Sequence, residues 1–204
     1  MIVGKQKHIG LAIALALVFA ISRIPGIMPE NFSAAYALAF CAGVYFPGAM
    51  AWWFPLGIML ATDILLNIFH YHVAPISPFM LAVYGCYGLL VFLGKKFRNS
   101  NSFLFLLSGG IIGAILFYLI TNTISWITDP GYQKNLSGWI QALTTGLPGY
   151  PPTWVFFKNT LLSGGLFTGL FAGSMKIAEA TSEKEETEDA EEGETEPANE
   201  NASS

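Results

Sequence analysis

The stretch from residue 34 to residue 69 most constrains the fold, because it is almost entirely apolar and contains a single charged residue, Asp63. A bilayer core requires about 20 mostly apolar residues per helix. The stretch is too long for one such helix, and Pro47-Gly48 interrupts it with residues typical of turns. We therefore predict two membrane helices here, at about 33–46 and 49–69.

The rest of the chain contains four further apolar runs of this kind. They are residues 9–21, 78–94, 103–127 and 154–177. Between the last two, residues 132–152 carry apolar side chains on one helical face, which is typical of an interfacial helix. We predict an all-α integral membrane protein of about six transmembrane helices. Because the helix at 33–46 is short, a five-span interpretation remains open.

Charged residues divide the chain into two parts. Of 14 acidic residues, 11 fall between Glu179 and Glu200, whereas residues 1–178 hold only three, against nine Lys and Arg. The acidic part lacks the apolar surface that offsets the entropy of ordering. We predict a transmembrane domain at 1–178 and a disordered acidic cytoplasmic tail at 179–204. The few, scattered basic residues do not indicate nucleic-acid binding.

The placement of Lys and Arg predicts how the helices cross the bilayer. Six spans put both termini on one side, together with most basic residues: Lys5, Lys7, Lys95, Lys96, Arg98, Lys176 and Lys184. The other side holds Arg23 and Lys134. The positive-inside rule then places both termini in the cytoplasm, and we expect a multi-pass protein of the bacterial inner membrane. A competing interpretation treats the N-terminal lysines and the apolar run after them as a secretory signal peptide.

Polar residues within the predicted spans fall at a similar depth. Successive helices run in opposite directions, so the distance from each helix end gives the depth at about 1.5 Å per residue. The layer near the outer face contains Arg23, Asn31, Asp63, Asn67, Tyr84, Cys86, Asn122, Lys158 and Asn159. Ionisable groups inside a membrane are costly and mark functional sites by default. We predict a substrate pocket open to the outside; an Asp63–Lys158 ion pair that holds helices together is the alternative, and the two are compatible.

Two further patterns concern metals and cofactors. The alternate histidines His70 and His72 can reach one metal ion, but no third ligand lies nearby, so we predict no metal site. Cys86 behaves by default as a small buried hydrophobe. If its thiolate faced the pocket, a cobalamin-like ligand held through cobalt would be one hypothesis, and no other cofactor is indicated.

A stripe of small residues runs along the first helix. Ala12, Ala16 and Ala20 recur at four-residue spacing, which lets another helix approach closely. Together with short helices, cytoplasmic termini and an outward pocket, this stripe resembles the S components of energy-coupling-factor vitamin transporters. In that family the stripe docks a transmembrane T component, so the resemblance implies a T component and ATPase subunits as partners.

More specifically, the chain resembles an uncharacterised bacterial membrane family over residues 9–177. The segments that carry this resemblance are Ser22-Arg23, Pro29-Glu30-Asn31-Phe32, Ala39-Phe40-Cys41-Ala42-Gly43, Pro55-Leu56, Asp63, Phe117, Thr121-Asn122 and Phe156-Phe157-Lys158-Asn159-Thr160-Leu161-Leu162. The chain departs from the family pattern at Ser163-Gly164-Gly165, where relatives carry an acidic residue. The resemblance implies a substrate-binding membrane subunit without identifying its ligand.

Three functions are compatible with these patterns. The leading hypothesis is an uptake subunit, not an enzyme, that binds a vitamin-like molecule near the outer face of the membrane. The chain has no nucleotide-binding motif, so ATP coupling would require other subunits. The second is an intramembrane enzyme that uses Asp63 with His70 or His72 as acid and base. The third is a structural or assembly protein whose polar layer only packs helices.

Overall fold

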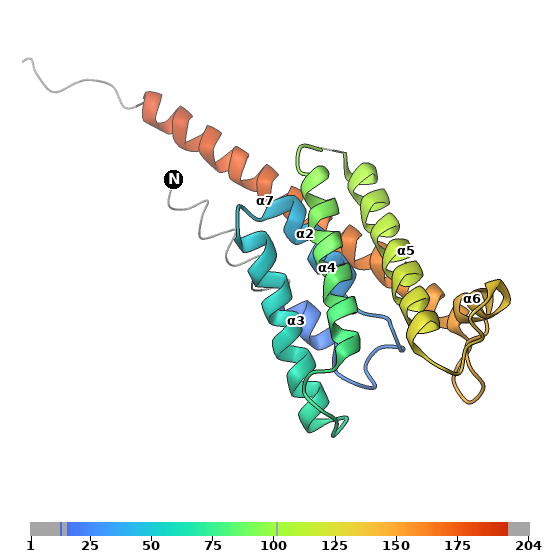
Figure 1. Ribbon diagram of the computed structural model, residues 1–204. Helices are drawn as coiled ribbons and strands as arrows, with labels where there is room; N and C mark the ends of the chain where they lie inside the picture. Colours follow the sequence, from blue (N-terminus) through green and yellow to red (C-terminus); the bar gives the residue numbers. More distant parts are fainter. Residues whose placement is uncertain (1–12, 14–15, 101, 196–204) are drawn as a thin grey trace, which may run out of the picture.

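The computed structural model describes residue 13, residues 16–100 and residues 102–195, and its regular elements are helices (Figure 1). Residues 16–22 are helical, and after them come α2 (Ala35–Tyr45), α3 (Met50–Phe69), α4 (Pro78–Lys96), α5 (Phe103–Thr128), α6 (Leu136–Leu143) and α7 (Thr153–Thr195). No strand occurs in these described segments. The all-α prediction is confirmed.

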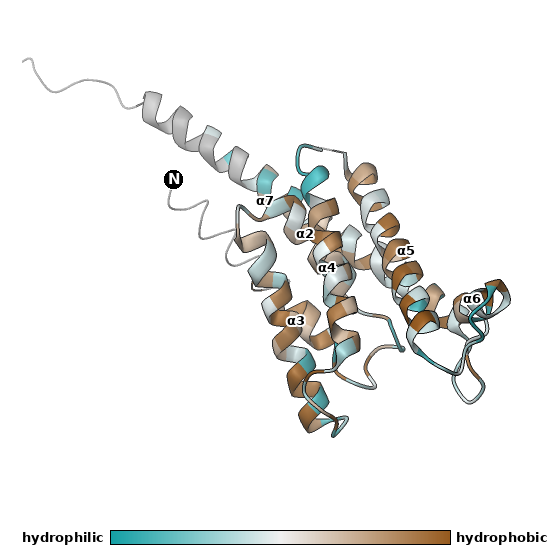
Figure 2. Cartoon of the chain, in the orientation of Figure 1, coloured by the Kyte–Doolittle hydropathy of each residue, from teal (hydrophilic) through white to brown (hydrophobic). Residues whose placement is uncertain are grey.

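Four of these helices are long and apolar enough to cross a membrane. They are α3, α4, α5 and residues 153–181 of α7. Apolar residues dominate their surfaces, and the hydrophilic ones gather mainly at the helix ends and in the loops (Figure 2). This pattern is that of a membrane protein, as predicted. The predicted total of six spans is not confirmed, because α2 has only 11 residues, and about 16 Å of helix does not cross a bilayer core alone.

The short helix α2 forms the centre of the bundle. Ten of its 11 residues, from Ala35 to Val44, are buried. A helix that is apolar on every side is stable only when other helices surround it. α2 contacts α3, α4, α5 and α7, so the core of the protein is built around it.

Two glycines allow α2 and α4 to cross with their backbones in contact. A Cβ atom on Gly43 would lie 2.1 Å from the carbonyl oxygen of Val91. A Cβ atom on Gly94 would lie 2.0 Å from the carbonyl oxygen of Phe40. Real Cβ atoms do not approach a backbone oxygen this closely, so the crossing requires glycine at both positions.

The region 132–152 forms a short helix rather than a span, in line with the predicted interfacial segment. The side chain of Asn135 caps α6 by accepting a hydrogen bond of 2.9 Å from the Gly138 amide. The Tyr118 hydroxyl of α5 donates to the carbonyl oxygen of Leu143 at 2.7 Å. These bonds fix α6 against the end of α5.

The acidic tail differs from the prediction. α7 continues as a helix to Thr195 and projects beyond the other helices, so the prediction of disorder is wrong for residues 179–195 (Figure 1). Residues 196–204 lie outside the described part. Ala, Glu and Lys are strong helix formers, and the preceding span removes the cost of nucleating the helix. A composition that cannot build a core can therefore still form a helix.

Candidate functional site

A cavity of about 740 Å³ lies at one end of the bundle. Its wall comes from residues 22–33, the C-terminal halves of α3 and α5, and the N-terminal ends of α2 and α4. Of the predicted site residues, the cavity brings together Arg23, Asn31, Asp63, Asn67 and Asn122. Five residues chosen for their predicted depth, from three segments of the chain, therefore line one cavity.

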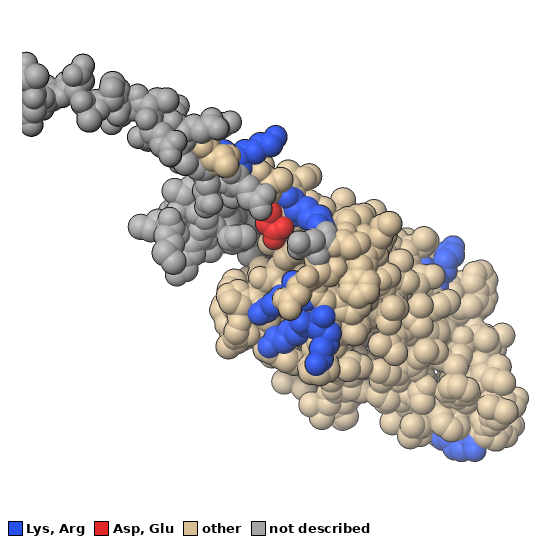
Figure 3. All heavy atoms as spheres, turned by 90° about the horizontal axis from the view of Figure 1, so that it is seen from above, with Lys and Arg blue, Asp and Glu red and all other residues tan. Residues whose placement is uncertain are grey.

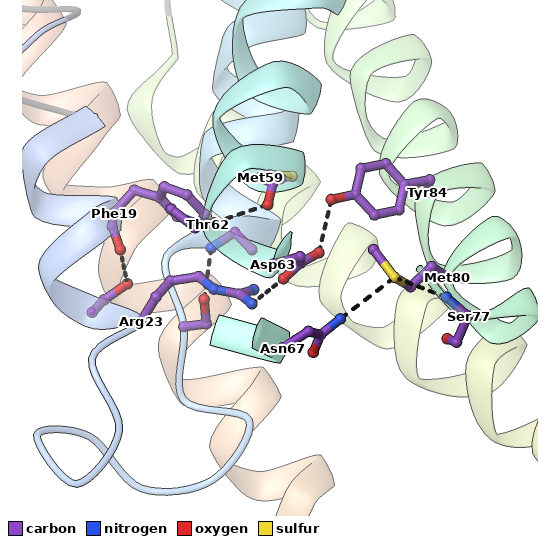
Figure 4. A network of polar contacts seen from close by, with 12 residues as sticks. Phe19, Arg23, Met59, Thr62, Asp63, Asn67, Ser77, Met80 and Tyr84 are labelled. Atoms are coloured by element: carbon purple, nitrogen blue, oxygen red, sulfur yellow. Dashed lines mark hydrogen bonds and ion pairs between the residues drawn. The ribbon is translucent and has the colours of Figure 1, made fainter. Parts of the chain in front are cut away.

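An ion pair lies in the wall of this cavity (Figure 4). Arg23 follows the helix at 16–22, and its Nη2 donates to Oδ1 of Asp63 on α3. The Tyr84 hydroxyl of α4 donates to the other carboxylate oxygen at 2.7 Å. The guanidinium also lies 5.8 Å from the centre of the Phe19 ring, within cation–π range. Asp63 thus joins three segments of the chain.

The predicted Asp63–Lys158 pair is wrong. Lys158 is exposed and does not line the cavity, whereas Asp63 pairs with Arg23. The neighbouring Asn159 is buried instead, and its Nδ2 donates to the carbonyl oxygen of Glu30 at 2.9 Å. Consecutive residues of a helix point about 100° apart, so the burial of Asn159 does not bring Lys158 into the core. The sequence argument gave the depth of Lys158 but not its direction around the helix.

Local hydrogen bonds hold the amide side chains of Asn67 and Asn122 and the backbone around Asn31. Nδ2 of Asn67 donates to the carbonyl oxygen of Pro75 at 3.1 Å, and Nδ2 of Asn122 donates to that of Tyr118 at 2.8 Å. Asn31 has a positive φ of 58°, a left-handed conformation that Asn tolerates better than most residues. Its carbonyl oxygen accepts a bond of 3.3 Å from the Tyr36 hydroxyl. The loop before α2 is therefore shaped by local bonds at the cavity edge.

Sequence reasoning did not select the aromatic side chains of the cavity. Tyr36, Tyr87 and Phe117 line it. The rings of Tyr87 and Phe117 stack with centroids 5.3 Å apart and an interplanar angle of 21°, and Tyr36 meets Phe117 edge-on at 4.8 Å. The available signal was spacing, because Tyr87 follows Tyr84 by three residues and so shares its helix face.

Cys86 and the histidines contribute little to this site. Cys86 is buried and does not line the cavity, so the cobalt–thiolate hypothesis has no support from its position. His70 lines the cavity, but His72 does not. The described residues contain no group of three or more His, Cys, Asp or Glu that could hold a metal ion.

The alanine stripe is only partly described, since Ala12 lies outside the described residues. Ala16 and Ala20 are half-buried on the helix at 16–22. Leu17 and Ile21, on other positions of the same helix, are exposed. The structure contains no partner chain, so docking through this stripe stays a prediction.

Basic residues gather at the end of the bundle opposite the cavity. Figure 3 looks onto this end, where blue Lys and Arg side chains cluster. Lys95 and Lys96 form the last turn of α4, and Arg98 follows them. Nε of Arg98 donates to the Val44 carbonyl oxygen at 3.2 Å, and Nη2 bonds the carbonyls of Gly43 and Phe46, so Arg98 caps α2.

Comparison with known proteins places the chain among its relatives. A family model described as "Family of unknown function (DUF6580)" matches residues 4–187. The chain belongs to this family. Membership in DUF6580 confirms the predicted resemblance to an uncharacterised family, and the match extends further into the acidic segment than predicted. No match was found among curated proteins.

Proposed function

We propose that this DUF6580 protein is a substrate-binding membrane subunit that takes up a vitamin-like small molecule. The observation that carries the proposal is the cavity of about 740 Å³, which combines a charged pair, three amides and three stacked or edge-on aromatic rings. Small-molecule sites in proteins are concave, of this size, and lined by aromatic groups with a few placed polar groups. A purely structural polar layer needs no such empty volume.

The distribution of charge supports a cavity that opens to the outside. Lys95, Lys96, Arg98 and Lys176 lie at the opposite end of the bundle, and the positive-inside rule favours that end as the cytoplasmic one. We therefore propose an inner-membrane protein with cytoplasmic termini, in which ligand enters from the outer face. Because the chain has no nucleotide-binding motif, active uptake would require a T component and ATPase subunits.

A binding role explains the site better than catalysis. Both carboxylate oxygens of Asp63 already accept hydrogen bonds, from Arg23 and Tyr84. His70 forms no hydrogen bond or ion pair with Asp63, so the pair proposed for acid–base chemistry is not assembled.

Filling the cavity tests the proposal. Native mass spectrometry of the protein purified from its expression host should detect a bound small molecule. Ser125→Trp on α5 places a bulky ring in the cavity wall and should abolish that binding. Thr128→Trp, one turn further on an exposed position outside the cavity, is the matched control and should retain it. A ligand that binds both variants equally, or no ligand in any preparation, would contradict the proposal.

A further inference from the structure

The one formally cationic side chain among the described residues of the cavity is already paired with a carboxylate. The formally charged lining residues of the cavity, within the described part of the chain, are Arg23, Asp63 and Glu30. Arg23 is neutralised by Asp63, and Glu30 adds negative charge. A carboxylate or phosphate group would meet no uncompensated cation and would lie beside the Asp63 carboxylate. Since a buried charge needs a partner, the cavity disfavours anionic ligands.

The ion pair still has hydrogen-bonding capacity that no group in the described part of the chain uses. Arg23 carries five N–H donors, and among the described residues it bonds only Asp63. Asp63 has about four lone-pair sites and accepts one bond from Arg23 and one from Tyr84. Both side chains of the ion pair remain partly exposed, at 20% and 15%, and both line the cavity. The wall therefore presents unused donors directly beside an unused acceptor.

Resting on the binding function proposed above, we propose that the ligand is an uncharged planar heterocycle with an N–H group next to a carbonyl oxygen, as in a cyclic imide. Arg23 donates to the carbonyl oxygen, and Asp63 accepts from the adjacent N–H. The aromatic rings of Tyr87 and Phe117, in the same cavity, supply flat apolar surface for such a ring. The Tyr84 hydroxyl holds the carboxylate in its orientation from the other side.

Binding of simple imides to the wild-type protein in lipid nanodiscs tests this inference. The probes are 1-methyluracil and phthalimide, in which the imide N–H is the only N–H group, each compared with the counterpart that also carries a methyl group on the imide nitrogen. Methylation of the imide nitrogen removes the N–H group that is to donate a hydrogen bond to Asp63. It leaves the ring and its carbonyl groups in place. Isothermal titration calorimetry should show a loss of affinity of about tenfold or more on methylation. Because this comparison uses the wild-type protein, it does not depend on the folding of a variant.

Two substitutions connect the effect to the proposed residues. Asp63→Ala, which removes the acceptor oxygens, should abolish the discrimination between parent and methylated probe, and size-exclusion chromatography checks that this variant folds. Lys158→Ala, at the exposed position outside the cavity, should leave affinity and discrimination unchanged.

Three outcomes overturn the inference: neither imide binds, the methylated probes bind as well as their parents, or the carboxylated analogue orotate binds more tightly than uracil. The proposed function is judged separately. If these probes fail while a co-purified molecule is lost in Ser125→Trp, the protein binds a ligand of another class. If no preparation contains a ligand and no probe binds, both proposals fall.

Discussion

Arg23 and Asp63 form a mostly buried ion pair between segments 40 residues apart in the sequence. Removing one partner of such a pair strongly lowers the free energy of unfolding, because the other charge is left unpaired in a poorly solvated place. The pair therefore makes the loop before α2 and the C-terminal half of α3 depend on each other. At the scale of single residues, this dependence can be measured.

Asp63→Ala should destabilise the protein by about 3 kcal/mol, because it leaves the Arg23 guanidinium without its partner. The double variant Arg23→Ala with Asp63→Ala should be less destabilised than the sum of the two single variants. Thermal or denaturant unfolding in detergent measures each value. Lys158→Ala serves as the control and should change stability by no more than about 0.5 kcal/mol, as is usual for exposed positions. If Lys158→Ala instead restored the stability of Asp63→Ala, the Asp63–Lys158 ion pair suggested by the sequence would be supported and the Arg23–Asp63 pair contradicted.

Asn159 on α7 contacts the same loop before α2. Its Nδ2 reaches the carbonyl oxygen of Glu30, and the amide is buried. Asn159→Ala removes this donor and should cost about 1 kcal/mol. Hydrogen–deuterium exchange should rise in residues 24–33 and stay unchanged in α6. Unchanged exchange in the loop would show that its position depends on the Ser22 and Tyr36 contacts alone.

At the scale of helices, the crossing of α2 and α4 depends on two residues without side chains. Gly43→Ala or Gly94→Ala drives a methyl group into the backbone of the facing helix and should cost about 1–3 kcal/mol or more. Gly57→Ala on α3 is the matched control, because a Cβ there meets nothing within 4 Å. Unfolding of the three variants in the same detergent separates overpacking from helix propensity. Equal stability of all three would mean that α2 and α4 are further apart than described.

The apolar runs and their interruptions predicted the helices well: five of the six predicted ranges overlap α2 to α5 and α7, and the first, residues 9–21, lies partly outside the described residues. Helix ends also predicted the cavity level, because antiparallel helices bring residues of equal depth together. Direction around each helix was not predictable from depth, and this is why Lys158 was assigned to the site. The burial of α2 and the aromatic wall at Tyr87 and Phe117 depend on packing between helices, which no single run of sequence specifies.

At the scale of the whole molecule, the two ends of the bundle differ in chemistry. One end holds a polar cavity whose ion pair is internally neutral, and the other holds the cations at the end of α4 and on α7. The acidic stretch of α7 continues from the basic end. The positive-inside rule favours the basic end of the protein on the cytoplasmic side, and this orientation turns the cavity outward. This orientation decides whether the cavity can serve uptake.

Cysteine labelling determines the orientation directly. Cys41 and Cys86 are buried, so a single introduced cysteine should dominate labelling by a membrane-impermeant maleimide. Glu30→Cys, at the exposed edge of the cavity, should be labelled in intact spheroplasts, because the positive-inside rule places that edge outside. Lys96→Cys, at the basic end, should be labelled only after the membrane is permeabilised. The opposite pattern would turn the cavity toward the cytoplasm, where a ligand-binding subunit would serve export or sensing of an internal metabolite rather than uptake.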